Sequence, residues 1–241
     1  MPRIYLPVIH LSDNQISITG EKSRYLTSVL RCRKGDDLIV FDGEGNCFRT
    51  SLIKSEKKEV VVEIIGKFPC NPESSLDITL VQGLLKGEKM DMVVQKTTEL
   101  GVKAIFPVIT ERSQLRETRK IARWRKIAEE ASRQSGRSVV PAVHEQVDFE
   151  KFFCESPATE HGAIFYEEGG MTLSNAFSNF IPRPSSFTIL VGPEGGFTRA
   201  EVNLAIGKGL IAASLGRRIL RAETAAISAV TLVQFLLGDM D

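Results

Sequence analysis

Residues 189–201 read ILVGPEGGFTRAE, and this stretch decides how the second part of the chain folds. An apolar strand runs directly into a loop of three glycines and one proline, and Thr198 with Glu201 then forms a capping-box pattern that opens a helix. A strand, a tight glycine loop and a helix N-terminus together predict a ligand site at the carboxyl end of a sheet strand. Glycine content alone also allows a plain strand-to-helix turn, and the spacing does not match the G-x-G-x-x-G pattern of dinucleotide sites.

Residues 214–226 read SLGRRILRAETAA and form a second loop that leads into a helix. Ile219 and Leu220 stand between arginines, which is an unusual setting for core residues, although simple core packing is the alternative. The helix expected over 223–237 is apolar on nearly every side. Such a helix needs cover on both sides, which its own sheet and a second subunit could supply.

The pattern around these loops alternates between strands and helices from residue 76 onward. Strands are predicted over 76–81, 104–108, 163–166 and 187–191, and helices over 88–100, 118–135, 198–207 and 223–237. This alternation predicts an α/β fold with a mostly parallel sheet covered on both faces.

Residues 1–70 have a different character, because their apolar residues alternate with the period of β-strands. Strands are predicted over 16–18, 38–41, 47–53 and 60–65, with one helical patch over 21–30. The pattern predicts a small barrel-like β domain. Pro69 and Pro72 flank a polar stretch, residues 71–75, that is typical of a linker.

Composition limits the classes of protein that the chain can belong to. Its 241 residues are 42% hydrophobic and 25% charged, which is ordinary for a globular protein and excludes wholesale disorder. No apolar run reaches the roughly 18 residues of a membrane span, and the first residues lack a signal-peptide core, so we expect a cytoplasmic protein. The net charge of +1 argues neither for nor against a polyanionic partner such as nucleic acid. The four cysteines and three histidines are scattered, which predicts separate thiols and no metal site.

Basic residues cluster locally even though the whole chain is nearly neutral. Residues 112–137 contain nine lysines and arginines but only three acidic residues. One interpretation is the solvated outer face of a helix, and the other is a ridge that contacts phosphates. The excess of arginine over lysine suits bidentate phosphate contacts.

The two loop motifs together resemble a known family. GPEGG at 192–196, followed by LGxxILRxETA at 215–225, resembles the knotted SPOUT methyltransferases. More narrowly, it resembles the ribosomal RNA small subunit methyltransferase E family, which makes N3-methyluridine in small-subunit (16S) ribosomal RNA. FDGEG at 41–45 and QSGR at 134–137 extend the likeness. Two stretches depart from it: residues 23–25 replace a histidine pair, and residues 165–169 replace a His-Pro-rich segment.

The resemblance implies a fold and a set of partners. It implies a PUA-like β-barrel that binds RNA over residues 1–70, and a SPOUT α/β domain over 76–241 with a C-terminal trefoil knot within about 163–235. It also implies a homodimer that acts on ribosomal RNA in the assembled small subunit. The cofactor would be S-adenosylmethionine, held where the turns ending at Phe197 and Thr224 form one crevice. The implied cofactor-binding residues are Leu190, Val191, Gly192, Glu194, Gly196, Leu215, Gly216, Ile219, Leu220 and Arg221.

Uracil N3 is a weak acid that must lose its proton before or during methyl transfer. Arg221 is the candidate cation that stabilises the resulting anion, and Glu223 is a candidate proton acceptor. The alternative for Glu223 is a capping or dipole role at the start of its helix. The arginines expected to contact RNA are Arg3, Arg31, Arg33, Arg112, Arg116, Arg123 and Arg137. Ribose 2′-O methylation and a non-catalytic RNA-binding assembly role remain alternative functions.

Overall fold

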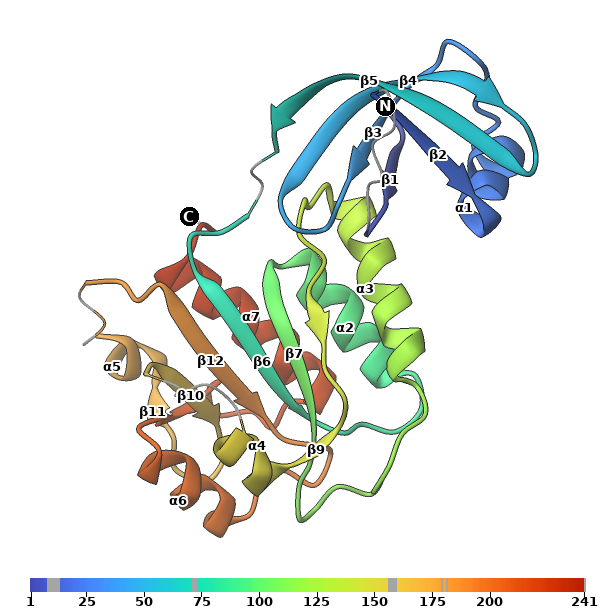
Figure 1. Cartoon of the computed structure of the whole chain (residues 1–241). Coiled ribbons are helices and arrows are strands. Elements are labelled where there is room, and N and C mark those ends of the chain that lie inside the picture. The colour runs from blue at the N-terminus through green and yellow to red at the C-terminus, as the bar shows by residue number, and fades with distance from the viewer. Residues whose placement is uncertain (8–13, 71–72, 156–159, 179, 181, 241) are drawn as a thin grey trace. The chain divides into compact units, whose positions relative to one another are not determined.

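The computed structural model describes residues 1–7, 14–70, 73–155, 160–178, 180 and 182–240 (Figure 1). The chain divides into two compact units. Unit 1 contains Met1–Glu73 and Ser132–Val140, and unit 2 contains Ser74–Ala131 and Pro141–Asp241. The main division therefore falls within the stretch that the sequence marks as a linker. The domain boundaries drawn from the sequence did not place Ser132–Val140 with the first unit.

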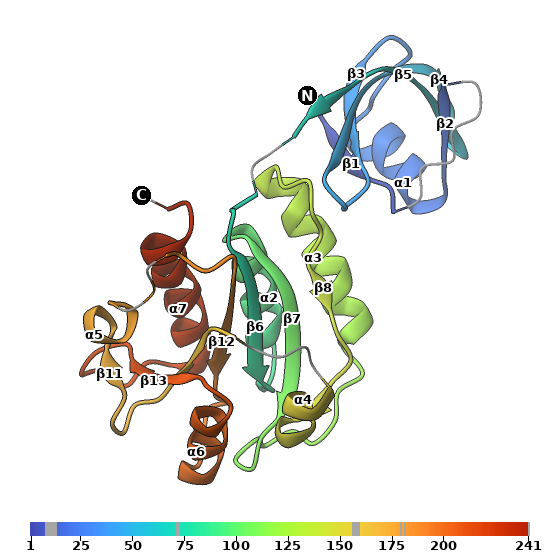
Figure 2. The same cartoon turned by 60° about the vertical axis from the view of Figure 1, so that its left-hand side comes forward.

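Unit 1 is built on one five-stranded sheet. Its strands are β1 (Arg3–Tyr5), β2 (Gln15–Thr19), β3 (Asp37–Phe41), β4 (Asn46–Ser55) and β5 (Glu59–Pro69), in the order β1-β3-β4-β5-β2. The pair β1–β3 is parallel and the other pairs are antiparallel. The sheet curls around α1 (Gly20–Arg24) and the π-helix η1 (Tyr25–Val29), as Figure 2 shows. Register shifts between β4 and β5 are the kind of irregularity that bends a sheet in this way.

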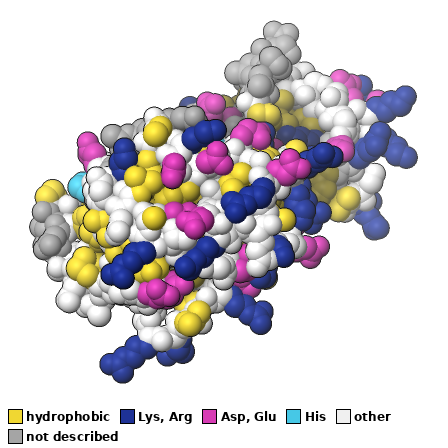
Figure 3. All heavy atoms as spheres, turned by 90° about the horizontal axis from the view of Figure 1, so that it is seen from below, with side chains coloured by type: hydrophobic (Ala, Val, Ile, Leu, Met, Phe, Trp, Pro, Cys, Tyr) yellow, Lys and Arg dark blue, Asp and Glu magenta, His cyan; other side chains and the backbone are white. Residues whose placement is uncertain are grey.

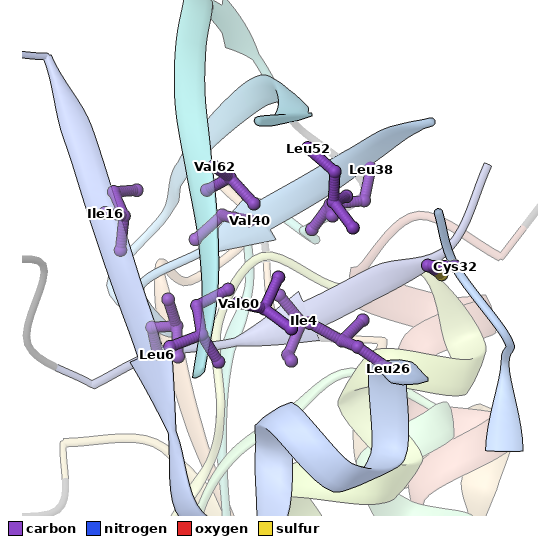
Figure 4. Close-up of a cluster of buried hydrophobic side chains, with 11 residues drawn as sticks. Ile4, Leu6, Ile16, Leu26, Cys32, Leu38, Val40, Leu52, Val60 and Val62 are labelled. Atoms are coloured by element: carbon purple, nitrogen blue, oxygen red, sulfur yellow. The ribbon is translucent and has the colours of Figure 1, made fainter. Parts of the chain in front are cut away.

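The core of unit 1 follows from the two-residue period of its strands. Leu38 and Val40 of β3, and Val60 and Val62 of β5, point to the same side and are fully buried (Figure 4). Leu26 of η1 closes this cluster from the helical side. The prediction of a small β domain is confirmed as a curled sheet. Within the described residues, the ladder runs from β1 to β2 without a pairing that joins these two edges.

A buried ion pair attaches the segment Ser132–Val140 to the rest of unit 1. The Glu73 carboxylate accepts hydrogen bonds from Arg137 Nη2 at 2.7 Å, from Ser138 N at 3.0 Å and from Val139 N at 3.1 Å. The Arg137 side chain is only 4% exposed. A residue expected to lie in a polar linker thus serves as an anchor within unit 1.

The expectation of four separate thiols is wrong at two positions. Cys47 and Cys70 form a disulfide with a Cα–Cα distance of 5.7 Å. Cys47 lies opposite Phe68 in the β4–β5 register, so the side chain two residues further along comes within reach of it. Cys32 is a buried free thiol and Cys154 an exposed one.

Unit 2 contains an eight-stranded sheet in which every pair is parallel. The strand order is β11-β13-β10-β12-β6-β7-β8, with β9 paired to β7. The parallel sheet predicted from the sequence is confirmed. Its strands are β6 (Asp77–Gly83), β7 (Val102–Ile109), β8 (Ala142–Val143), β9 (Val147–Asp148), β10 (Gly162–Phe165), β11 (Met171–Thr172), β12 (Ser186–Val191) and β13 (Ile211–Ser214).

Helices cover both faces of this sheet, as predicted (Figures 1 and 2). They are α2 (Lys89–Glu99), α3 (Ile121–Ser135), α4 (Phe149–Glu155), α5 (Leu173–Phe177), α6 (Arg199–Gly207) and α7 (Ala222–Leu237). Phe149 and Phe152 of α4 pack with Val202 of α6 in one core cluster, which also holds Leu190 of β12. Helices α2 and α7 pack together on the other side. No helix among the described residues is long and apolar enough to cross a membrane.

The Glu73–Arg137 pair generates a prediction about stability. Glu73→Ala should lower the free energy of unfolding by about 3 kcal/mol, because it removes the carboxylate that pairs with the buried Arg137 and the acceptor of two backbone amides. Urea denaturation measures this loss. The control is Asp37→Ala, which removes the partner of the half-exposed Arg49 and should cost no more than about 1 kcal/mol. Equal losses in the two variants would contradict the anchoring role of Glu73.

Candidate functional site

The glycine loop, residues 192–198, leaves the sheet at the end of β12 beside β6. Gln82 of β6 is fully buried, and its Nε2 donates to the carbonyl oxygens of Val191 at 3.4 Å and Gly192 at 3.1 Å. A Cβ atom placed on Gly83 would lie 2.5 Å from Pro193 N. Only a glycine at position 83 therefore lets the loop pass so close to β6.

The second half of the glycine loop is held by the start of α6 and by the segment after β7. The predicted capping box is confirmed: Glu201 Oε2 accepts from Thr198 N at 2.8 Å, and Thr198 Oγ1 accepts from Glu201 N. Glu201 Oε1 also accepts from Glu111 N at 2.8 Å. Arg112 Nη1 donates to the carbonyl oxygens of Gly195 and Phe197. Contacts from α6 and from the segment after β7 thus fix the conformation of the loop.

Glu194, in the middle of the glycine loop, is bound to the start of α2. Its Oε1 accepts from Lys89 Nζ at 2.9 Å and from Lys86 N at 3.2 Å. Burial alone would raise the pKa of Glu194, but the hydrogen bond from Lys89 and those from backbone amides together lower it below its usual value. The ionised carboxylate is therefore engaged within the protein.

The arginine loop, residues 214–221, joins β13 to α7. Gly216 has a φ of +106°, in the left-handed region that favours glycine, and its N–H donates to Ser214 Oγ at 3.2 Å. Arg221 is the N-cap of α7 through its backbone, since its carbonyl oxygen accepts from Ala225 N at 2.8 Å. Ile219 is 87% exposed, so it is not a core residue.

The glycine loop, the arginine loop and the end of β10 enclose one cavity of about 330 Å³. This volume lies in the range of small-molecule sites. The prediction that the turns ending at Phe197 and Thr224 lie beside each other is confirmed by this shared cavity. Its lining comprises residues 165–167, 191–194, 196–197, 214–216 and 218–222, with Lys89 and Ala225. Among the described residues, no group of three or more His, Cys, Asp or Glu side chains gathers in a way that could hold a metal ion.

Comparison with known proteins assigns the chain to a family. The model of an RNA methyltransferase domain matches residues 72–234, and the model of an RNA methyltransferase PUA domain matches residues 18–65. The Ribosomal RNA small subunit methyltransferase E of Bacillus subtilis (strain 168) is 33% identical over 245 residues, which cover 94% of each chain. The chain belongs to the ribosomal RNA small subunit methyltransferase E family.

Solved structures of similar proteins share the fold along the whole chain. The Ribosomal RNA small subunit methyltransferase E of Neisseria gonorrhoeae, bound to S-adenosyl methionine, is 36% identical with a TM-score of 0.91 and covers 100% of both chains. Lpg2936 of Legionella pneumophila, in complex with the bound cofactor SAM, is 34% identical with a TM-score of 0.89 and covers 99% of this chain and 98% of its own. The fold expected from the resemblance to the methyltransferase E family is thus confirmed as an α/β unit together with a PUA domain.

Nine of the ten residues expected to bind a cofactor line the cavity, and their binding role stays a prediction. The exception is Leu190, whose fully buried side chain packs in the core cluster with α4 and α6. Adjacent strand residues face opposite sides of a sheet, and only the end of β12 reaches the cavity. We therefore withdraw Leu190 as a cofactor contact.

The two candidate catalytic residues have different positions. Arg221 lines the cavity and is exposed. Glu223 does not line the cavity, and its Oε2 is buried without a hydrogen-bond partner among the described residues. Its place in the first turn of α7 fits the alternative interaction with the helix dipole. Its role as proton acceptor stays a prediction.

Four of the arginines expected to contact RNA bond backbone carbonyl oxygens or the Glu73 carboxylate of the protein. Arg137 is 3% exposed and paired with Glu73, so it is withdrawn as a phosphate contact. Arg112 donates to the glycine loop, and Arg116 donates to the carbonyl oxygens of residues 110 and 111. Arg3 donates to the carbonyl oxygen of Arg137 at 2.9 Å. Much of the predicted basic ridge therefore holds the fold together.

The other three arginines are exposed, as are Arg112 and Arg116, but they do not bond backbone carbonyl oxygens of the described residues. The Arg123 side chain is 61% exposed and pairs with Asp91 at 2.7 Å. Arg31 and Arg33 of unit 1 are exposed, and their side chains have no hydrogen-bond or ion-pair partner in the described part of the chain. Figure 3 shows basic, acidic and hydrophobic side chains interspersed on one face, which agrees with the near-zero net charge.

Sequence reasoning missed several residues of the site. Gln82 was an available signal, because it is a polar residue directly after the apolar end of the strand predicted over 76–81. Residues 165–167 lie at the carboxyl end of the strand predicted over 163–166, and carboxyl ends of parallel strands meet at one edge of a sheet. Lys89 and Arg218 carried no signal of their own, because surface helices and loops commonly contain such residues.

The Gln82 contacts generate a prediction about the glycine loop. Gln82→Met keeps the approximate volume but removes the donor to buried carbonyl oxygens, so the free energy of unfolding should fall by about 1–3 kcal/mol. Denaturant unfolding followed by circular dichroism measures this change. Gln95→Met, on the exposed side of α2, is the matched control and should be close to neutral. If both variants were as stable as the parent, Gln82 would not hold the loop.

Proposed function

We propose that this protein transfers the methyl group of S-adenosylmethionine to N3 of a uridine in small-subunit (16S) ribosomal RNA. The observation that carries the proposal is the single cavity between the glycine loop and the arginine loop. Membership of the methyltransferase E family supports the reaction, and the cofactor bound to the full-length Neisseria gonorrhoeae relative supports the ligand. The substrate of bacterial ribosomal RNA methyltransferases also supports the cytoplasm as the site of action.

The residues of the cavity fit the parts of this cofactor. Ile219 and Leu220 offer apolar surface for the face of an adenine, and the backbone of Gly192 and Leu215 can bond its edge. Charged side chains of both signs suit the amino-acid tail. When bound, the cofactor supplies a reactive sulfonium methyl group, and the protein supplies orientation and electrostatics.

Arg221 is the residue proposed to act on the uracil. Its exposed guanidinium lines the cavity, where it can stand beside O2 or O4 and stabilise the negative charge that develops when N3 loses its proton. The proton would pass to Glu223 or to a water molecule. Arg31, Arg33 and Arg123 are the proposed phosphate contacts, because their side chains are exposed.

We also propose the trefoil knot within residues 163–235. The strands follow each other along the chain as β10, β12 and β13, but they lie in the sheet as β13-β10-β12. After β13 the chain returns past β10, because α7 packs against β12 and β6. The arginine loop makes this return directly beside the glycine loop. A path of this kind is the arrangement that threading of the C-terminal segment would produce.

A homodimer is proposed from the surface of α7. Phe235 is 59% exposed, and Leu232 and Leu236 beside it are half-buried. Met92, on the neighbouring helix α2, is 49% exposed. An apolar helix face of this kind favours burial against a second copy of the chain.

The activity can be tested with small ribosomal subunits that lack the modification. The parent protein should transfer tritiated methyl groups from S-adenosylmethionine, and nucleoside mass spectrometry should identify N3-methyluridine. Arg221→Ala should lower turnover by about 100-fold or more, because a preorganised cation at the developing charge is lost. Arg217→Ala, an exposed arginine of the same loop that does not line the cavity, is the control.

Each alternative function predicts a different result in this assay. A 2′-O-methylated nucleoside would replace the proposed reaction with ribose methylation. RNA binding without methyl transfer would leave a non-catalytic assembly role. Equal activity of Arg221→Ala and Arg217→Ala would remove Arg221 from the mechanism.

The dimer has its own test. Phe235→Glu places a charge on the apolar face of α7 and should convert the dimer to a monomer in analytical ultracentrifugation. Ile206→Glu is the control, because Ile206 is also exposed, at 47%, but lies on α6. A parent protein that sediments as a monomer, or a Phe235→Glu variant that remains dimeric, would contradict this interface.

A further inference from the structure

The cavity contains a carboxylate that the protein itself does not engage. Glu167 lines the cavity just after β10, and its side chain has no hydrogen-bond or ion-pair partner among the described residues. The other cavity carboxylate, Glu194, already accepts hydrogen bonds from Lys89 and from the Lys86 backbone amide. The two acidic residues therefore have different roles. Glu194 stabilises the glycine loop that lines the cavity, whereas Glu167 remains available to bind a ligand.

The backbone places Glu167 against the glycine loop. The N–H of Tyr166 donates to the carbonyl oxygen of Ala213 at 2.9 Å, which fixes the chain one residue earlier. A Cβ atom placed on Gly196 would lie 2.6 Å from Glu167 Oε1, so the carboxylate occupies space that a side chain would otherwise fill. The next residue, Glu168, accepts from the Tyr166 hydroxyl at 3.0 Å and does not line the cavity. Only the first of the two consecutive glutamates faces the ligand space.

The remaining charges of the cavity define what Glu167 can bind. Arg218 and Arg221 also line the cavity, and neither has an acidic partner within the described residues. A free amino-acid group is a zwitterion, which needs an anion for its ammonium and a cation for its carboxylate. The cavity offers one carboxylate and two guanidinium groups that are not paired within the described part of the protein, and since Arg221 is proposed to act on the uracil, Arg218 is left for the carboxylate of the tail. This charge set matches the methionine tail of the cofactor.

The methionine tail carries two cationic groups, the α-ammonium and the sulfonium, which differ in their ability to donate hydrogen bonds. An α-ammonium group has three N–H donors, and a carboxylate is the strongest acceptor that a protein offers them. A sulfonium centre has no N–H or O–H donor. Glu167, with all of its acceptor positions open, therefore suits the ammonium group better than the sulfur.

We propose that Glu167 binds the α-ammonium group of the methionine tail of S-adenosylmethionine. This inference rests on the proposed function, because it requires the cavity to be the cofactor site. Glu167 is then a cofactor-binding residue that positions the tail against the glycine loop.

The test measures three ligands against the full-length protein and two variants. The ligands are S-adenosylmethionine, S-adenosylhomocysteine and an S-adenosylhomocysteine analogue in which hydrogen replaces the α-amino group. Glu167→Gln keeps the shape of the side chain and removes its charge. It should raise the Kd of the first two ligands by the same factor, about 10- to 100-fold, and leave the Kd of the analogue unchanged. Glu168→Gln is the matched control and should leave all three values unchanged.

Each other result overturns the assignment in a different way. A loss confined to S-adenosylmethionine would place the carboxylate at the sulfonium, and an equal loss for all three ligands would show only a distorted pocket. Unchanged affinities would remove Glu167 from the site. The parent protein is measured first by calorimetry, so a parent that fails to bind S-adenosylmethionine contradicts the proposed function and not only the role of Glu167.

Discussion

The contact between β6 and the glycine loop is the constraint on which the site depends. The Gln82 amide donates to the carbonyl oxygens at the end of β12, and the missing side chain at Gly83 lets Pro193 approach. The parallel register places Gln82 opposite Val191, so this contact follows directly from the order of strands in the sheet. Once the loop leaves the sheet at this point, its backbone must turn toward β10 and the arginine loop, and the cavity forms between them.

Features that depend on nearby residues could be predicted from the sequence. The capping box of Thr198 and Glu201, the strand before it and the helices α2, α3, α6 and α7 follow from short-range patterns, and the structure confirms them. The short helices α4 and α5 and the strand β13 were not predicted. The adjacency of the two loops was expected only from the family resemblance, because β13, the strand before the arginine loop, was not among the strands predicted from the sequence. The family resemblance supplied the chemistry, which periodicity alone does not carry.

Features that depend on distant residues could not be predicted in this way. Glu73 and Arg137 are 64 positions apart, and nothing local indicates that one anchors the other. The disulfide between Cys47 and Cys70 depends on the β4–β5 register, which bulges shift. Leu190 is apolar like its neighbour Val191, so only the pleat of β12 decides which of them reaches the cavity. In each case the sequence gives the residue type, and the tertiary structure gives the partner.

The arginines show why a high density of basic residues in the sequence does not reveal what each of these residues does. Arg112 and Arg137 belong to the same basic run as Arg123, yet Arg112 bonds the glycine loop, Arg137 forms a buried ion pair with Glu73, and Arg123 forms an exposed ion pair with Asp91. The charges around the cavity differ in another respect, which is whether each is compensated within the protein. Compensated charges, such as Glu194 with Lys89, fix the backbone around the cavity. Charged side chains that line the cavity without a partner in the described part of the chain, such as Glu167, remain free to pair with a charged group of a ligand. Whether a charged residue already has a partner within the protein therefore distinguishes the residues that stabilise the cavity from those that bind the ligand.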